Sequence, residues 1–455
     1  MERLLFVAAL CALSFAYGAA TLQFEIFPYG LLKQAKLGWE AWAAVGAERL
    51  PKAFEKFEPG AAPRPQAKRL ARGAGDEYVL VSGGPYQLME RCPTFGCVAW
   101  ITDRAGRVVH AWELDFDAAR AGLAGVSGEV SRLSVYPVGM ALGADGSLAV
   151  TFQGRDTYPI YLGLVKIDRR GAILWKRFDH SHHWPAIDAE GRIYTPYARA
   201  VRDLKHAGAS AVALACRTGE ASVDAIRVLA ADGEPLREIP LLEALLRGGY
   251  GGLFYGLRDG CDPTHLNSVA LLPEAAARAI PGAAPGDLLV SLRETSAIAL
   301  LGATDGAVKY LVAGRTAAQH SPQFLPDGTV LAFDNLGGER SRGGSRIVRL
   351  DLVKGIARTV FPRAGEAELL PVRSQTAGHI SVSPDGQRAL VSLTHQGRIV
   401  EIDVASGEPL WLYDNTHDIG GFLQAGGLDA PTPRARFATY GAYYVRNPTF
   451  LEEGQ

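Results

Sequence analysis

The chain has 455 residues, of which 48% are hydrophobic and 21% charged, and its formal net charge is −1. Because there is no basic excess, neither nucleic acid nor an anionic membrane surface is expected as a partner. The length fits one large β architecture or two to three domains. The 52 glycines and 26 prolines, with short valine- and leucine-rich runs between them, favour turn-rich β structure.

The N-terminus carries an export signal. An apolar run from Leu4 to Ala20 follows one early positive charge and ends in small residues, which is typical of a secretory signal peptide. A retained membrane anchor is the alternative, because apolar residues continue to Phe27 and a span needs roughly 20 of them; a buried helix is a third interpretation. With residues 1–20 as signal or anchor, we expect a periplasmic or otherwise extracytoplasmic protein, with possible attachment to the inner membrane.

Five cysteines are present, and Cys11 lies in the export segment. The other four form an even set, which in an exported chain suggests disulfides with three possible connectivities: Cys92, Cys97, Cys216 and Cys261. Cys92 and Cys97 are close enough to close a small loop, so we favour that pair, and Cys216–Cys261 follows by elimination. Buried free thiols are the alternative. A Cys-x-x-Cys motif is absent, which argues against a redox or structural zinc site.

Residues 21–76 are expected to connect the export segment to the folded part. Apolar residues recur at three- to four-residue spacing over residues 29–50 and predict an amphipathic helix. Residues 51–75 are rich in proline and basic residues and predict a solvated linker. The globular part is expected to span residues 77–455.

Glycine-containing turns recur along the globular part. Asp-Gly or Glu-Gly turns suited to β-hairpins stand between an early pair of strands at 145–146, 190–191, 327–328 and 385–386. A second set of turns precedes a final strand that often ends in an aromatic residue. These turns are about 50–70 residues apart, and four short strands per repeat at such a period predict a β-propeller.

We therefore predict an all-β, six-bladed β-propeller, preceded by the apolar segment and helix; seven blades are the alternative. The expected blades are roughly 77–117, 132–180, 182–240, 264–313, 319–362 and 377–414. Residues 437–440 and 443–445 look like strands without a blade of their own. Ring closure would explain them, because an unpaired first or last blade leaves open edges.

Four of the ten histidines stand at equivalent blade openings. His320 and His183 each precede a turn by seven residues, and His379 precedes one by six, while His265 opens blade 4. The first strand of a blade usually lines the central channel, so these imidazoles are expected to converge at its mouth. Each one alone could equally be a hydrogen-bonding residue at a strand end.

A histidine cluster can bind a metal, act as acid, base or nucleophile, or bind an anion as imidazolium. Arg293 follows the second strand of blade 4, and a guanidinium at the mouth favours an anionic substrate over a metal. Arg293 could instead pair with Glu294 at the surface. A phosphate-binding P-loop, a Gly-x-Ser-x-Gly elbow and a His-Glu-x-x-His helix are all absent from the sequence.

Several motifs resemble those of the bacterial arylsulfate sulfotransferases, in a short form without the N-terminal β-sandwich. The resemblance covers about residues 135–415 and rests on these segments: His265-Leu266-Asn267-Ser268-Val269, Arg293, Gln319-His320 before Pro326-Asp327-Gly328, Phe333-Asp334-Asn335, and the pair His182-His183. It implies an exported six-bladed enzyme that transfers a sulfuryl group from an aryl sulfate to a phenol without a nucleotide donor or cofactor.

The resemblance also implies roles in a ping-pong mechanism. His320 would attack sulfur and become a sulfohistidine. Arg293, His265 and Asn267 would hold the sulfuryl oxygens. His183 or His379 would protonate the leaving phenolate. Either His182 or His183 could align with the family histidine, and the turn spacing favours His183.

Two other functions compete with this one. The first is a non-catalytic, membrane-tethered propeller that binds a protein or glycan partner at its mouth. The second is a metal-dependent hydrolase or lactonase with a histidine-lined channel. In the family, a β-sandwich precedes the propeller; here only a helix and linker precede it, so a dimer built on that sandwich is not expected.

Overall fold

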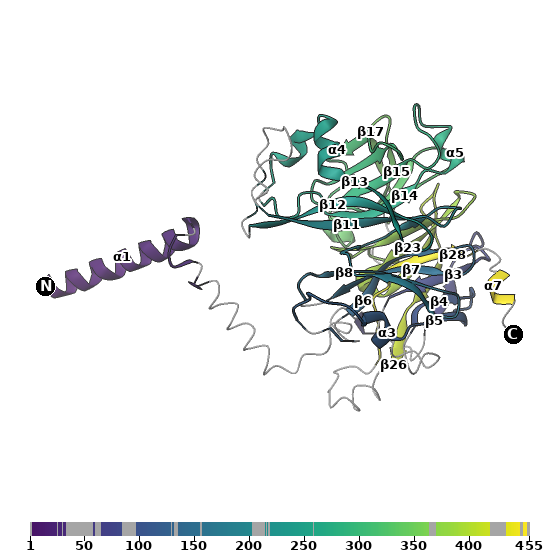
Figure 1. Ribbon diagram of the computed structural model, residues 1–455, viewed down its shortest axis with the longest axis horizontal. Helices are drawn as coiled ribbons and strands as arrows, with labels where there is room; N and C mark the ends of the chain where they lie inside the picture. The colour runs from purple at the N-terminus through teal and green to yellow at the C-terminus, as the bar shows by residue number, and fades with distance from the viewer. Residues whose placement is uncertain are drawn as a thin grey trace. The chain divides into compact units, whose positions relative to one another are not determined.

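The computed structural model describes residues 2–24, 26–29, 31–32, 58–59, 65–83, 97–128, 130–131, 135–154, 157–202, 214, 216, 219–257, 259–363, 370–418, 434–445 and 449–452. The chain divides into two compact units, residues 1–50 and 51–455. In the first unit, α1 (Glu2–Phe24) is drawn in purple in Figure 1. Among the described residues, α1 is the one helix that is both long enough and apolar enough to cross a membrane. A signal sequence and a membrane anchor would both have this character. Most of the helix expected over residues 29–50 lies outside the described residues.

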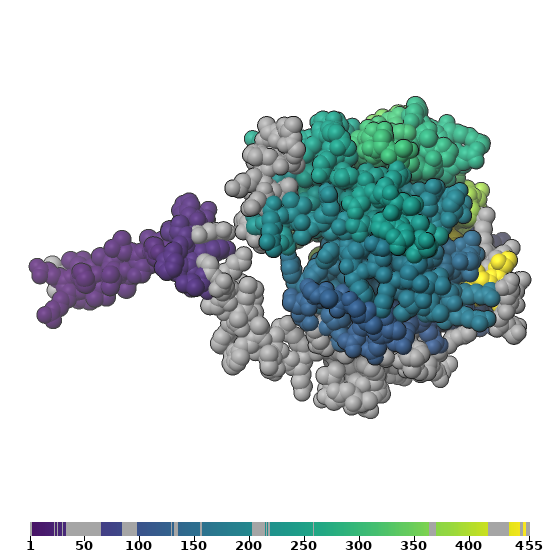
Figure 2. Space-filling view, viewed as in Figure 1, coloured from purple at the N-terminus to yellow at the C-terminus, as the bar shows by residue number. Residues whose placement is uncertain are grey.

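The second unit contains six sheets that form the predicted propeller. The strands of blades 1 to 3 are β3 (Tyr78–Ser82), β4 (Cys97–Thr102) and β5 (Val108–Glu113); β6 (Val135–Leu142), β7 (Leu148–Gly154), β8 (Tyr161–Ile167) and β9 (Ile173–Arg177); and β10 (Ala186–Ile187), β11 (Ile193–Arg202), β12 (Glu220–Leu229) and β13 (Pro235–Pro240). In Figure 2, blades 2, 3 and 4 follow one another in chain order along the visible face, from blue through teal to green.

The strands of blades 4 to 6 follow the same order. They are β14 (Leu266–Leu271), β15 (Leu288–Leu292), β16 (Ala297–Leu301) and β17 (Val308–Ala313); β18 (His320–Phe324), β19 (Val330–Asp334), β20 (Arg346–Asp351) and β21 (Ile356–Phe361); and β22 (His379–Val382), β23 (Arg388–Leu393), β24 (Arg398–Asp403) and β25 (Pro409–Asp414). Six blades are therefore confirmed.

Shorter elements lie between the blades, within them and at either end of the propeller chain. They are α3 (Phe116–Arg120), α4 (Leu241–Arg247), α5 (Glu274–Ala277), α7 (Thr449–Glu452), the 3₁₀ helices η3 (Gly251–Phe254), η4 (Arg340–Arg342) and η5 (Thr394–Gln396), and a small sheet of β1 (Glu58–Pro59), β26 (Thr416–Asp418) and β27 (Arg434–Arg436).

The last strand of the chain closes the ring. β28 (Gly441–Val445) pairs antiparallel with β3 and becomes the inner strand of blade 1 (Figure 1). Around the axis, β28 contacts β6, and contacts between inner strands continue through β10, β14, β18 and β22 back to β28. The predicted closure is thus confirmed. The four residues before β28, Phe437–Tyr440, are not a strand, because their backbone groups bond to blade 6 and β3 instead.

Two strands, β1 and β2, lie inside the segment expected to be a linker. β2 (Gln66–Arg69) pairs with β25 and adds a fifth strand to the outer edge of blade 6. The sequence did not predict β2, because its residues are mostly polar and exposed. An edge strand needs no apolar alternation when its outer face meets water. Pairing covers the otherwise open edge of β25.

Tryptophans near the ends of three final strands fasten blades 1, 2 and 6 to the blade that follows each of them. The indole Nε1–H of each donates to a backbone carbonyl in a turn of the following blade, which satisfies a polar group inside an apolar contact. The three bonds run from Trp112 to Gly146 (2.9 Å), from Trp175 to Ala231 (3.0 Å) and from Trp411 to Arg104 (3.0 Å). These hydrogen bonds explain why the three tryptophans recur near the ends of repeats in the sequence.

Where blade 6 meets blade 1, two arginines and two glutamates form a buried network. Glu401 is fully buried; its Oε1 accepts from Arg104 Nη2 at 2.9 Å and from the Tyr444 hydroxyl at 2.9 Å. Arg388 Nη2 lies 2.7 Å from Glu77 Oε1. This bond from Arg388 is the main reason that the pKa of Glu77 is lowered to about 2. The network ties residues at both ends of the propeller chain to β23 and β24.

We expect Glu401→Gln to destabilise the protein by about 3–5 kcal/mol, because two buried guanidiniums would then share one carboxylate. Asp76→Asn is the matched control, since the side chain of Asp76 is 93% exposed and its pair with Arg69 contributes about 1 kcal/mol or less. Chemical denaturation of the full chain measures both. Equal midpoints for the two variants would contradict a structural role for the network.

Candidate active site

The four predicted histidines stand at the starts of inner strands, as their spacing indicated. His320 and His379 are the first residues of β18 and β22, while His265 directly precedes β14 and His183 precedes the start of β10 by three residues. The ring centroids of His183 and His265 are 5.3 Å apart, although the residues belong to different blades. The first-strand contacts around the axis bring these openings together.

The backbone at these openings is strained. His183 and His265 adopt positive φ angles of 52° and 46°. Ala318 and Ala377, each two residues before a site histidine, have φ angles of 54° and 60°. A non-glycine residue in this region costs on the order of 1–3 kcal/mol and concentrates at functional sites. At each of these openings, the strained backbone turns sharply into the inner strand of the blade.

His320 is held in one tautomer. Its Nδ1 lies 3.1 Å from the carbonyl of Ala318 and 2.8 Å from Oδ1 of Asn335. The amide of Asn335 is oriented by Nδ2, which donates to the carbonyls of Ser374 and Ala377. Because a carbonyl can only accept, Nδ1 of His320 must carry the hydrogen, and Nε2 keeps its lone pair. Burial lowers the pKa of His320 to about 3, so the ring is neutral at neutral pH.

His265 forms a pair with a residue that the sequence reasoning missed. Asp262 accepts from the backbone N–H of His265 at 3.1 Å, and its other oxygen lies 2.5 Å from Nδ1 of the ring. The carboxylate therefore holds the ring's orientation and can stabilise a proton on it. The three-residue spacing was the only signal in the sequence, and such a spacing is too common to be specific.

His182 and His183 contact each other, with their Nδ1 atoms 2.6 Å apart, so one donates and the other accepts. His182 is 1% exposed, its Nε2 lies 3.3 Å from Asp224, and its ring stacks on Tyr161 at 4.2 Å between centroids. His183 is the one of the pair whose ring lies next to His265. Burial, and then the nearby charges of His182 and His265, hold the pKa of His183 well below its usual value.

Arg293 belongs to the same group of side chains. Its backbone N–H donates to the carbonyl of His265 at 3.1 Å. Its charge is a minor contribution, after burial, to the lowered pKa of both His183 and His320. The surface ion pair that was expected as an alternative is also present, since Nη1 of Arg293 lies 3.5 Å from Oε2 of Glu294. Only 26% of the Arg293 side chain is exposed, which leaves its charge weakly screened.

Trp184 lies close to three of the four predicted histidines, including His379. The Trp184 ring lies 5.8 Å from His379, 6.1 Å from His320 and 6.0 Å from His183, so it stands in the middle of the inner ring. The other neighbour of His379 is Tyr443 of β28, at 4.4 Å. Burial lowers the pKa of His379 to about 3.

Asn267 is buried beneath the site. It is completely buried, and Nδ2 donates to the carbonyl of Gln319 at 2.8 Å. This bond fixes the residue before His320 from the neighbouring blade. Oδ1 of Asn267 and Nε1 of Trp184 are buried without a hydrogen-bond partner among the described residues. Such groups are uncommon in native interiors, and here two of them lie around one histidine cluster.

A cavity of about 370 Å³ adjoins this cluster. Tyr161 and Asp262 form part of its wall, and both also contact the site histidines. The cavity lies between the outer parts of blades 2 and 3 and the segment that leads into β14. A reacting group bound at the histidines would therefore have adjacent space for the rest of its molecule.

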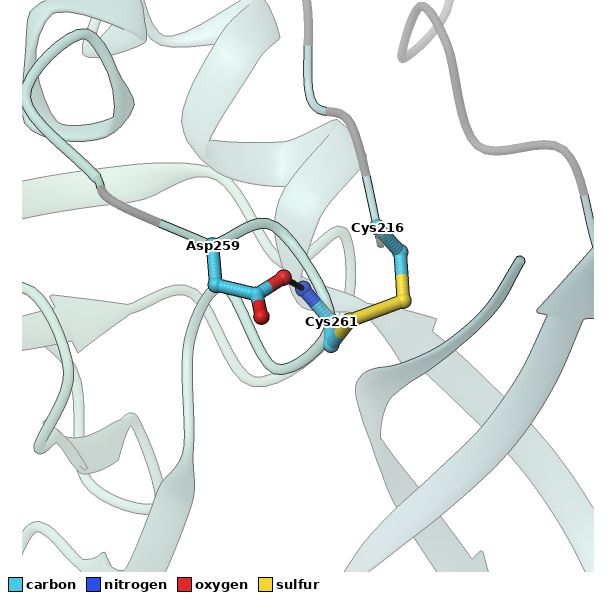
Figure 3. Close-up of side chains that lie close together, drawn as sticks. All are labelled: Cys216, Asp259 and Cys261. Carbon is cyan, nitrogen blue, oxygen red and sulfur yellow. Dashed lines mark hydrogen bonds between the residues drawn. A yellow bond between two sulfur atoms is a disulfide. The ribbon is translucent and has the colours of Figure 1, made fainter. Parts of the chain in front are cut away.

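A disulfide joins Cys216 to Cys261, the residue directly before Asp262 (Figure 3). Asp259 accepts from the backbone N–H of Cys261 at 3.1 Å. Among the described residues, these three form the only group of three or more whose ligand atoms lie close enough for a metal ion, and its two sulfurs are bonded to each other. The predicted Cys216–Cys261 pair is thus present in the structure, while the expected Cys92–Cys97 pair falls on Cys92, which lies outside the described residues.

We expect the double variant Cys216→Ser/Cys261→Ser to be less stable by about 2–4 kcal/mol, because the bond closes a 45-residue separation. Denaturant titration of the full chain measures the loss. Cys11→Ser, in α1, is the control and should leave the midpoint of the second unit unchanged. A double variant as stable as the parent would show that the disulfide does not restrain this segment.

Acid should destabilise the fold through the buried histidines. In the unfolded chain their pKa is near 6.5, whereas in the folded chain the pKa of His320 and of His379 is about 3. Between those values the unfolded state binds more protons, so the free energy of unfolding falls as the pH drops from about 6.5 towards 3. We expect His379→Gln to reduce this slope, measured by denaturation at several pH values. His395→Gln, which lies outside the cluster, should not reduce it.

The fold and site together define a six-bladed propeller with a buried histidine cluster beside its axis. Residues 243–415 match the family model described as arylsulfotransferase (ASST). The resemblance inferred from the motifs is therefore confirmed over that part, and the chain carries an arylsulfotransferase-family region. The matching region includes His265, Arg293, His320 and His379, whereas His183 lies before residue 243. No curated protein matches the chain in a sequence comparison.

Similar solved structures are distant. One is a protein of unknown function from Bacteroides caccae, at 14% identity over 74% of this chain and 93% of that chain, with a TM-score of 0.43. Hydrazine synthase from Kuenenia stuttgartiensis has 14% identity over 68% and 74%, with a TM-score of 0.36. Virginiamycin B lyase from Staphylococcus aureus has 11% identity over 60% and 69%, with a TM-score of 0.34. At these scores the likenesses say nothing about what this chain does.

Proposed function

We propose that the chain is an aryl-sulfate sulfotransferase, which moves a sulfuryl group from an aryl sulfate to a phenol by a ping-pong mechanism. The observation that carries the proposal is the state of His320. Its Nδ1 donates to a backbone carbonyl, and its Nε2 is a neutral nucleophile within electrostatic range of Arg293. The match of residues 243–415 to the arylsulfotransferase family supports the same class of enzyme.

In the first half-reaction, Nε2 of His320 forms a bond to sulfur while the bond from sulfur to the phenolic oxygen breaks. The sulfuryl group passes to His320, and the aryl part leaves as a phenolate. Arg293 faces the negative charge on the sulfuryl oxygens, where a weakly screened guanidinium stabilises it most. The carbonyl of Ala318 and Oδ1 of Asn335 stabilise the positive charge that builds on the ring of His320.

The phenolate needs a proton, and we assign its transfer to His265 with Asp262. The expected donors, His183 and His379, are poorly suited, because burial lowers the pKa of both rings and keeps them neutral at neutral pH. The ring of His379 also packs against Trp184 and Tyr443. Asp262 can instead stabilise the protonated form of His265 at a contact of 2.5 Å.

In the second half-reaction, an acceptor phenol gives its proton to His265 and attacks the sulfur on His320. The bond from Nε2 to sulfur breaks, and the aryl sulfate product leaves with both histidines in their starting states. Asn267 serves as a positioning residue in this scheme, because its amide holds the backbone of Gln319 and is fully buried.

We also propose that residues 51–455 work outside the cytoplasm. The apolar helix α1 could serve as signal or anchor, and the Cys216–Cys261 disulfide suits an oxidising compartment. Residues 1–20 are then the targeting segment of the folded unit.

The test is release of 4-methylumbelliferone from 4-methylumbelliferyl sulfate in the presence of a phenol acceptor. We expect His320→Ala to lower kcat by about 10³-fold or more, because it removes the atom that bonds to sulfur. Mass spectrometry of the parent protein, denatured at alkaline pH after mixing with donor alone, should find one added sulfuryl group, and His320→Ala should lack it. His395→Gln serves as the matched histidine control and should keep full activity.

Equal release by the parent and by His320→Ala would remove His320 from its role. A parent protein that releases no phenol with any phenolic acceptor would instead favour the non-catalytic binding propeller.

A further inference from the structure

The cavity beside Asp262 has the character of a ring-binding site. On one side it is lined by Tyr158 and Ile160 of the connection between β7 and β8, and by Tyr161, the first residue of β8. On the other side it is lined by small side chains of β11, among them Ala200, and by the start of β12 at Glu220. Tyr158 is 65% exposed and Ile160 is 47% exposed, which is unusual for large apolar side chains gathered on one wall.

The polar tip of Tyr158 is already engaged. Its hydroxyl donates to Oε1 of Glu220 at 2.7 Å, and Oε2 of Glu220 accepts from Nε of Arg202 at 3.2 Å. These bonds join the connection in blade 2 to a strand of blade 3 and hold the Tyr158 ring at the cavity. The ring can then offer its face to an aromatic partner, and such contacts are worth about 0.5–1.5 kcal/mol beyond the buried area.

The inner end of the cavity reaches the reacting groups. Asp262 lies in its wall and holds His265, while the ring of Tyr161 lies 5.6 Å from that of His183. A phenolic oxygen placed near His265 would thus have its ring directed into the cavity, away from His320. The proton carrier and the ring site would be adjacent parts of one surface.

The volume of the cavity indicates how large an aromatic ring system it can hold. A cavity of roughly 150 Å³ holds one benzene ring. At about 370 Å³, this cavity has room for two ring units. A single-ring phenol would leave half of the apolar wall in contact with water and would gain correspondingly less from binding.

We propose that this cavity binds the aromatic portion of the substrate, and that it selects phenols with two rings over phenols with one. The inference rests on the proposed sulfuryl transfer, because it assigns the cavity to the same reaction. It adds a specificity site at Tyr158, Tyr161 and Ala200. These residues belong to blades 2 and 3, outside the region that matches the family.

Direct binding separates this proposal from catalysis. Fluorescence titration of the full chain with 4-methylumbelliferone, a two-ring phenol, is compared with calorimetric titration with 4-nitrophenol, which has one ring. We expect the parent to bind the two-ring phenol at least about tenfold more tightly. The His320→Ala variant should show the same preference, because it lacks the nucleophile and keeps the cavity.

Ala200→Trp fills the cavity from an exposed position and should weaken binding of 4-methylumbelliferone about tenfold while changing 4-nitrophenol binding much less. Tyr158→Ala should act in the same direction, and Tyr158→Phe should retain most of the affinity, because it keeps the ring. Leu174→Trp is the matched control, since Leu174 is an exposed residue on the outer strand of blade 2.

An equal affinity for the two phenols, or an unchanged preference in Ala200→Trp, would overturn the proposal. Ring-selective binding that Ala200→Trp abolishes, without any sulfuryl transfer by the parent, would support the ring site and count against the proposed reaction. Sulfuryl transfer with no ring preference would retain the reaction and reject the ring site.

Discussion

The pairing of β28 with β3 is the constraint on which the rest of the structure depends. It places the last strand of the chain at the inner edge of the first blade, and only then does each inner strand contact its neighbour around the axis. The buried network of Glu401 with Arg104 and Arg388 lies at the same junction of blades 6 and 1. The convergence of the blade openings is a consequence of closure, because an open arc of blades would leave the first and last openings apart.

In the closed ring, the burial and backbone strain of the histidines lower the free energy of unfolding. Neutral imidazoles are buried at the axis, and positive φ angles strain the backbone of His183 and His265. Both features oppose stability, because a buried imidazole loses its hydration and a positive φ angle strains the backbone. The surrounding blades, which are fastened by tryptophan bonds and buried ion pairs, hold this strained arrangement in place.

Around this centre, the site divides into an inner and an outer part. The inner part contains His320, Arg293 and the positioning residue Asn267, all from blades 4 and 5. The outer part begins at Asp262 and continues into the cavity of blades 2 and 3, where the Cys216–Cys261 bond restrains the segment that carries Asp262. This division suits a group transfer in which one charged group stays constant while the aromatic partner changes.

The sequence by itself determined the number of blades, because each blade repeats a local pattern of strands, turns and apolar residues. It also determined which histidines open the blades, since their spacing to the turns is local. It could not reveal β2, whose pattern is polar, or Trp184, which stands between histidines of other blades. Only the tertiary structure decided that His183 meets His265 and that Asp262 holds His265. The reason is physical: the protonation and tautomer of an imidazole depend on burial and on hydrogen-bond partners, and at this axis many of these come from distant parts of the chain.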